Sequence, residues 1–142
     1  MNRWMISRSI CDGSSFRHPC FFMWFVNGDQ KLGADDKKAI ESVENKNFIS
    51  VASLWEMAIK INIGKLSLSK PYHTVERQIE DNHIELLPIA FKHTLQIVSL
   101  PLHHRDPFDR LIIAQAMAEN MTVITKDENF KNYPIEIIWK SE

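Results

Sequence analysis

The chain has 142 residues, of which 44% are hydrophobic and 25% charged, and its formal net charge is −1. These values predict one globular domain with an ordinary core, and they exclude an overall basic field that would attract nucleic acid. No run of about 18 apolar residues occurs, so no membrane span is predicted. Both cysteines, Cys11 and Cys20, fall in the first twenty residues, which argues against a disulfide framework and favours a reducing compartment such as the cytoplasm.

The first twenty residues differ in composition from the rest of the chain. They contain Arg3, Arg8 and Arg17 but a single acid, Asp12, and they lack the continuous apolar stretch of a secretory signal. We expect residues 1–20 to form an atypical, poorly ordered segment before a domain over residues 21–142.

The remaining residues alternate short apolar strands with helices. An apolar run over 21–26 ends at Asn27-Gly28, which is a turn signal, and a polar helix is predicted over 35–44. The pattern then predicts strands over 48–51, 84–87, 121–125 and 135–139, and helices over 53–62, 74–82, 90–98 and 107–119. This alternation predicts an α/β fold whose parallel sheet is covered by helices on both faces.

The segment DPFD at 106–109 opens the most apolar of these helices and allows two interpretations. Asp106 can cap the helix, Pro107 suits its first position, and Asp109 then falls where the helix dipole favours a carboxylate. The helix that follows is apolar on most sides and should be buried, and buried helices seldom begin with two acids unless something pairs with them. Capping and a functional role therefore both remain open.

Glu56 and Asp127 also have a structural and a functional interpretation. SLWE at 53–56 fits a capping box, and Glu56 with Lys60 fits an i, i+4 ion pair. Asp127 follows a strand, at the sheet edge where α/β proteins bind ligands, but it also suits a turn. If these acids and those of the DPFD segment converge at one edge, they would repel one another unless they bind a cation such as Mg²⁺, which prefers oxygen ligands.

Three segments in this order, SLWEMAIKINIGKL, RDPFDRLIIAQAMAEN and VITKDENF, with WFVNGDQKL before them, resemble the PIN-domain ribonucleases of the VapC toxin type. The resemblance covers about residues 21–142. It implies a PIN-like α/β/α sandwich with a parallel sheet of about four to five strands. It also implies Mg²⁺- or Mn²⁺-dependent cleavage of RNA, a VapB-type antitoxin as partner, and a homodimer.

Carried over by motif, the resemblance implies that Glu56, Asp109 and Asp127 are the catalytic acids and hold the metal ion. Asp106 matches a second acid of the DPFDR segment, as a further acid of the metal site or as a helix cap that supports it. Arg110 and Lys126 neighbour these acids and could contact RNA phosphates, although salt bridges at the rim of the site would also explain them.

The chain departs from this family at the first strand. In the family that strand ordinarily ends in Leu-Asp-Thr-His, and its Asp is a metal ligand. This chain reads FRHPCFFMWF instead. The family's Asp usually stands six residues before the position of Trp24, and this chain has His18 there. One choice of codons for residues 16–20, read one base later, encodes Leu-Asp-Thr-His-Ala. The motif is thus either missing or frame-shifted, and a histidine nitrogen suits softer metals than Mg²⁺.

Two other functions are compatible with the sequence. A catalytically inactive PIN-like module that binds an antitoxin or RNA would account for the missing Asp, and a metal-independent α/β protein would use its acids only as caps. For an antitoxin we expect an apolar groove near the helices of residues 35–82, because Leu54, Trp55, Ile61 and Ile63 exceed what one helix can bury inward. We interpret the adjacent histidines 103 and 104 as solvent-facing loop residues.

Overall fold

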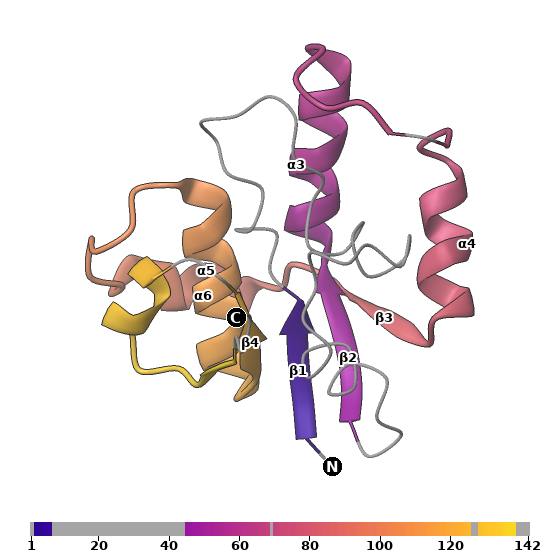
Figure 1. The fold of residues 1–142 in the computed structure, drawn as a ribbon. Helices are drawn as coiled ribbons and strands as arrows, with labels where there is room; N and C mark the ends of the chain where they lie inside the picture. The colour runs from indigo at the N-terminus through magenta and orange to yellow at the C-terminus, as the bar shows by residue number, and fades with distance from the viewer. Residues whose placement is uncertain (1, 7–44, 69, 126–127, 139–142) are drawn as a thin grey trace.

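Five parallel strands form one sheet in the part of the chain that the computed structural model describes, namely residues 2–6, 45–68, 70–125 and 128–138 (Figure 1). The order of the strands is β3-β2-β1-β4-β5. Their bounds are Asn2–Ile6 for β1, Asn45–Ser50 for β2, Ile84–Leu87 for β3, Thr122–Ile124 for β4 and Ile137–Ile138 for β5. Every pair of neighbours is parallel, which confirms the predicted α/β class. The apolar run over 21–26 and the helix expected over 35–44 lie outside the described residues.

The predicted helices are confirmed with small shifts at their ends. They are α3 over Val51–Asn62, α4 over Thr74–Asp81, α5 over Phe91–Val98 and α6 over Pro107–Glu119, and a short 3-10 helix, η1, covers Glu128–Asn132. In Figure 1, α4 stands beside β3, whereas α5 and α6 pack against each other on the side of β4. None of the helices in the described residues is long and apolar enough to cross a membrane.

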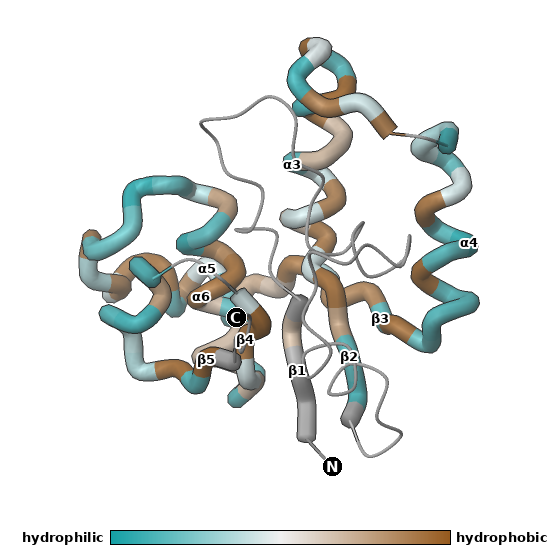
Figure 2. The backbone as a smooth tube through the Cα atoms, in the orientation of Figure 1, coloured by the Kyte–Doolittle hydropathy of each residue, from teal (hydrophilic) through white to brown (hydrophobic). Residues whose placement is uncertain are grey.

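The core lies between the sheet and α6. Figure 2 shows apolar residues along β4 and α6 and mostly polar residues along α4. α4 turns only Val75 and Ile79 inward as buried residues, whereas α6 buries residues on several sides, as its apolar sequence predicts. The buried cluster of this core contains Met5, Phe48, Leu87, Leu100, Ile112, Ile113, Ala116, Met121, Val123, Phe130 and Tyr133.

The central strand β1 comes from residues for which we expected no ordered structure. Ile6 pairs with Ile49 of β2 and with Ile124 of β4, and Met5 is completely buried. Residues 2–6 form a strand between two others, so that its backbone groups are satisfied on both sides, whereas residues 7–20 lie outside the described residues. The domain boundary near residue 20 stays a prediction.

This topology brings the ends of several elements to one edge of the sheet. Because β1, β2 and β4 are parallel, their carboxyl ends lie at the same edge. α3 begins directly after β2, and α6 runs back toward the start of β4, so that the first turns of both helices lie near that edge (Figure 1). Of the predicted site residues, Glu56 lies on α3, and Asp106, Asp109 and Arg110 lie at the start of α6.

Candidate metal centre

Asp106 caps α6. Its Oδ1 accepts hydrogen bonds from the backbone N–H groups of Phe108 at 2.8 Å and Asp109 at 3.2 Å, and Pro107 occupies the first position of the helix. These contacts satisfy donors that a helix start otherwise leaves open, so the capping interpretation is confirmed for this residue. Asp109 lies in the first turn and is 4% exposed. Of the two acids, Asp109 is the one that the fold buries.

Hydrogen bonds of two side chains, the guanidinium of Arg110 and the hydroxyl of Tyr133, hold the loop before α6. The guanidinium of Arg110 donates through Nη1 and Nη2 to the carbonyls of Leu100, Pro101 and His104, at 3.0 to 3.1 Å. The hydroxyl of Tyr133 accepts from the backbone N–H of His104 at 2.8 Å and donates to the carbonyl of Pro101 at 2.7 Å. Arg110 thus supports its own loop, and the phosphate contact suggested for it stays a prediction.

His104 is the residue of this region that sequence reasoning missed. We expected a solvent-facing side chain, but the structure leaves only 9% of His104 exposed, while His103 remains exposed. Its Nε2 lies 3.2 Å from Oδ2 of Asp109. Two adjacent histidines do not have the spacing of metal ligands, so the sequence pattern did not single out either one. Their positions relative to the helix differ, because only His104 stands two residues before the cap and can turn back onto the first turn of α6.

α3 begins two residues earlier than predicted, because a different serine caps it. The Oγ of Ser50 accepts from the backbone N–H of Ala52 at 3.1 Å. The predicted capping box from Ser53 to Glu56 was therefore wrong, and Ser53 is a buried residue inside the helix. Both serines have the chemistry of an N-cap, so sequence alone could not distinguish them.

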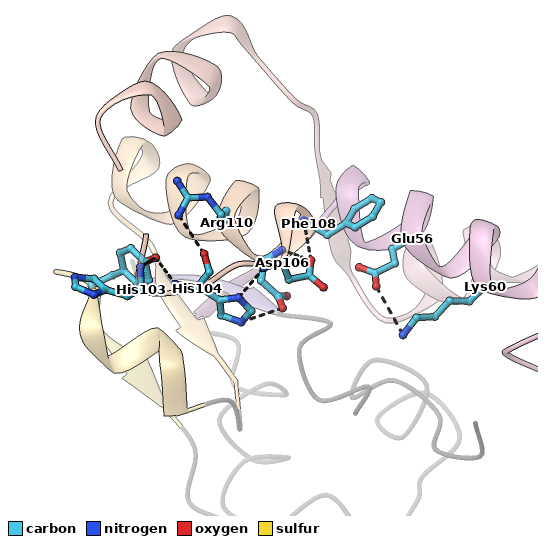
Figure 3. Close-up of polar contacts among 9 residues, drawn as sticks. Glu56, Lys60, His103, His104, Asp106, Phe108 and Arg110 are labelled. Carbon is cyan, nitrogen blue, oxygen red and sulfur yellow. Dashed lines mark hydrogen bonds and ion pairs between the residues drawn. The ribbon is translucent and has the colours of Figure 1, made fainter. Parts of the chain in front are cut away.

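Glu56 is buried on α3 and faces the start of α6. It is 6% exposed, and Oε1 lies 3.7 Å from Nζ of Lys60, as the i, i+4 spacing predicted. Next to it, the ring of Trp55 packs edge-on against Phe108 of α6, with ring centroids 5.0 Å apart. Figure 3 shows the Glu56 carboxylate directed toward the turn that carries Asp106. Glu56 is therefore a buried acid of α3 beside the contact of this helix with the start of α6.

The remaining predicted ligand, Asp127, lies outside the described residues, as does Lys126. Within the described residues, no group of three or more His, Cys, Asp and Glu side chains is placed to hold a metal ion. Glu56 and Asp109 fit Mg²⁺ or Mn²⁺ by the chemistry of their donors, because these hard cations take carboxylate oxygens together with water as ligands. The convergence of Glu56, Asp109 and Asp127 in one cleft stays a prediction.

The first strand carries no acid in its described part. β1 reads Asn-Arg-Trp-Met-Ile over Asn2–Ile6, and it ends beside Ile49 and Ile124 at the edge of the sheet that the site would occupy. His18, which stands at the position of the missing ligand, lies outside the described residues. The sequence therefore departs from the family's first-strand motif, and β1 contains no acid that would replace the missing Asp.

Two helices carry exposed apolar stripes. On α3 and its end, Trp55, Ile59 and Ile63 follow one another at a spacing of four residues and are exposed. The four residues named for an antitoxin groove are not all buried, since Trp55 is 56% and Ile63 55% exposed. Beside this stripe the hydroxyl of Tyr72 donates to the carbonyl of Leu54 at 3.1 Å, and burial raises the pKa of the Tyr72 phenol above its ordinary value. On α5 and the loop that follows it, the exposed apolar residues are Phe91, Leu95, Val98 and Leu102.

Comparison with known proteins gives one family and a set of similar folds. The family model described as PIN domain matches residues 20–136. The structure of VapBC2 from Rickettsia felis bound to a DNA fragment from its promoter is similar at a TM-score of 0.66 and 18% identity, over 96% of this chain and 97% of that one. DNA-bound VapBC from Salmonella typhimurium gives 0.65 and 16%, over 97% and 98%, and FitAcB from Neisseria gonorrhoeae gives 0.54 and 13%, over 94% and 95%. Comparison with curated protein sequences gives no match. The fold predicted by the resemblance is confirmed.

Proposed function

We propose, from the premise that this chain belongs to the PIN domain family, that it is a metal-dependent endoribonuclease toxin of the VapC type. The observation that carries the proposal is the burial of two carboxylates, Glu56 on α3 and Asp109 in the first turn of α6. Both acids stand in the segments that resemble the family's metal site. Burial in a poorly hydrated site strengthens the interaction of a carboxylate with a cation.

In this mechanism Glu56, Asp109 and Asp127 would hold Mg²⁺ or Mn²⁺, and Asp106 would keep the turn that presents Asp109 in place. When bound, the ion would supply a polarised water and neutralise charge on the phosphate during in-line attack. Glu56 or Asp109 would orient the attacking water and accept its proton. Lys126, next to Asp127 in sequence, would contact an RNA phosphate.

The two exposed apolar stripes support protein partners for this function. We assign the α3 stripe of Trp55, Ile59 and Ile63 to a VapB-type antitoxin, because an apolar helix segment can dock on such a surface. We assign the α5 stripe to a second copy of the chain, which would form a homodimer. The cysteine distribution favours the cytoplasm as the compartment.

A second function is favoured by the first strand. Because β1 contains no acid over Asn2–Ile6, no residue of this strand takes the place of the family's first-strand Asp. A catalytically inactive PIN-like module that binds an antitoxin or RNA would need only the surfaces of the fold and not the full metal site.

RNA cleavage by the purified chain tests the proposal. With fluorescent RNA, we expect slow cleavage that requires Mg²⁺ or Mn²⁺ and stops with EDTA. Glu56→Gln, Asp109→Asn and Asp127→Asn should each reduce the rate by about 10²–10³-fold, since each removes one electrostatic stabiliser. Asp106→Asn preserves the cap and should reduce the rate much less. Glu128→Gln, on an exposed residue of η1, is the matched control and should have no effect.

The outcomes separate the two functions. Cleavage that persists in EDTA, or that is insensitive to Glu56→Gln and Asp109→Asn, contradicts a metal-dependent mechanism at this site. RNA binding without cleavage at millimolar Mn²⁺ would instead support the inactive binding module.

A further inference from the structure

His104 has a defined protonation geometry in the structure. Its Nδ1 accepts a hydrogen bond from the backbone N–H of Asp106 at 3.1 Å, so this nitrogen carries no proton. The ring proton therefore lies on Nε2, which is 3.2 Å from Oδ2 of Asp109 and donates to it. One imidazole thus connects the backbone of the helix cap with the buried carboxylate one turn later (Figure 3).

The ring is held by contacts that do not involve Asp109. It packs edge-on against Phe130, a fully buried residue of η1, with ring centroids 5.7 Å apart. The backbone of His104 is bonded on both sides, by its N–H to the hydroxyl of Tyr133 and by its carbonyl to the guanidinium of Arg110. The donor that meets Asp109 is therefore fixed in direction before any ligand is present.

A fixed donor on one carboxylate oxygen determines where the other oxygen points. Because Nε2 holds Oδ2, rotation of the Asp109 carboxylate about its Cβ–Cγ bond is restricted, and the direction of Oδ1 follows. Hydrogen bonds of this kind orient the carboxylates that bind metal ions in proteins. We propose that His104 is the positioning residue for Asp109, which sets the direction in which this acid meets the cation; this inference rests on the proposed metal site.

The other end of α6 provides an internal comparison. There His93 has the same arrangement: its Nδ1 accepts from the backbone N–H of Ala90 at 2.9 Å, and its Nε2 lies 3.0 Å from Oε1 of Glu119. That carboxylate oxygen is also 2.6 Å from Nζ of Lys92, so the chain itself supplies the cation. The His93 contact joins α5 to α6, far from the proposed ligands, and it serves as the matched structural control.

Titration calorimetry with Mn²⁺ on three variants tests the role of His104. In His104→Asn the shorter side chain still accepts from Asp106 but no longer reaches Asp109, and we expect Mn²⁺ binding to weaken by about 10- to 100-fold. In His104→Gln the terminal amide N–H occupies a place close to Nε2, and we expect an affinity close to that of the natural chain. His93→Asn should lower the melting temperature and leave Mn²⁺ affinity unchanged.

These results distinguish failure of the inference from failure of the proposed function. If the natural chain binds Mn²⁺ and His104→Asn binds it equally well, or if His104→Gln is as weak as His104→Asn, the positioning role is wrong and the metal site stands. If neither the natural chain nor any variant binds Mn²⁺, the metal site itself is wrong, and the role fails with it. Long-range ¹H–¹⁵N spectra of the natural chain give a second measurement that needs no variant to fold: a proton on Nδ1 of His104 would overturn the proposed geometry.

Discussion

Arg110 illustrates how a cation beside an acidic site can belong to the backbone rather than to a ligand. It follows Asp109 directly, so in sequence it looks placed for a phosphate. In the structure its planar guanidinium donates to three carbonyls of the loop that carries His104. A planar fork can satisfy several acceptors at once, which an ammonium cannot do in the same geometry.

We predict that Arg110→Lys lowers the free energy of unfolding by about 1–3 kcal/mol, because about two hydrogen bonds to buried or half-buried carbonyls are lost while the charge is kept. Urea unfolding measures this change. Arg105→Lys, on an exposed neighbour in the same loop, is the control and should change stability by less than about 0.5 kcal/mol. An unchanged stability together with weaker RNA binding would show that Arg110 contacts phosphate instead.

The same residues show what the sequence of the site can and cannot predict. The cap at Asp106 and the ion pair of Glu56 with Lys60 were predictable, because both depend only on neighbours along one helix. The burial of His104 was not, since it depends on Phe130 and Tyr133, which lie more than twenty residues later in the chain.

Among the elements, α6 was predicted with its observed bounds because both ends carry strong signals. Asp106-Pro107 begins it, and Asn120 ends it in the left-handed conformation with φ at 54°. The start of α3 was misplaced because Ser50 has a tertiary role that a local pattern does not contain: besides capping the helix, its hydroxyl donates to the buried Oε1 of Gln115 on α6 at 2.5 Å. That bond also fixes α3 relative to α6, and thereby the two helices that carry the proposed ligands.

The two apolar stripes belong to different elements and can be tested against each other. Ile63 at the end of α3 and Leu95 on α5 are matched in exposure, at 55% and 56%, so that a lysine at either position should leave the fold intact. We predict that Leu95→Lys converts a dimer to a monomer, because a charge would be desolvated in the interface, and that Ile63→Lys leaves the dimer unchanged. Light scattering after size-exclusion chromatography measures the mass.

For binding of the antitoxin, we expect the opposite effects of the same two substitutions. With a co-expressed VapB-type antitoxin, Ile63→Lys should weaken the complex at least about tenfold, the effect of about 1.4 kcal/mol, while Leu95→Lys should not. Identical behaviour of the two variants in both assays would show that the stripes have not been assigned to separate partners correctly.

At the scale of the whole molecule, the parallel sheet and the family were predicted from the sequence, but the central strand was not. The family match begins at residue 20, whereas β1, between β2 and β4, is formed by Asn2–Ile6. A five-residue segment with a polar start gives little strand signal of its own, because its place is determined by strands that follow it by about forty residues or more. The sequence of the central strand was therefore not sufficient to predict its place in the sheet.

The central position of the sheet also bears on metal binding. The chain as written should bind Mg²⁺ loosely and cleave RNA poorly, because His18 stands where the family has a hard carboxylate ligand. A chain that begins Met-x-x-x-Leu-Asp-Thr-His-Ala directly before the segment around Trp24 restores the motif, and its new strand should take the place between β2 and β4. We expect this chain to regain Mg²⁺-dependent cleavage by about 10²-fold or more, as one restored stabiliser of charge would give.

The matched control carries Asn in place of the Asp of the restored motif, so that strand and packing are kept while the carboxylate is removed. Cleavage rate and Mn²⁺ affinity should rise only with the carboxylate, and circular dichroism should show the same fold in both chains. Two findings would contradict the frame-shift interpretation: genomic DNA without a GAC codon in the shifted frame, or full Mg²⁺-dependent activity of the chain as written. In the second case the site would operate with fewer carboxylates than its family resemblance implies, and Glu56, Asp109 and Asp127 would have to suffice for the ion.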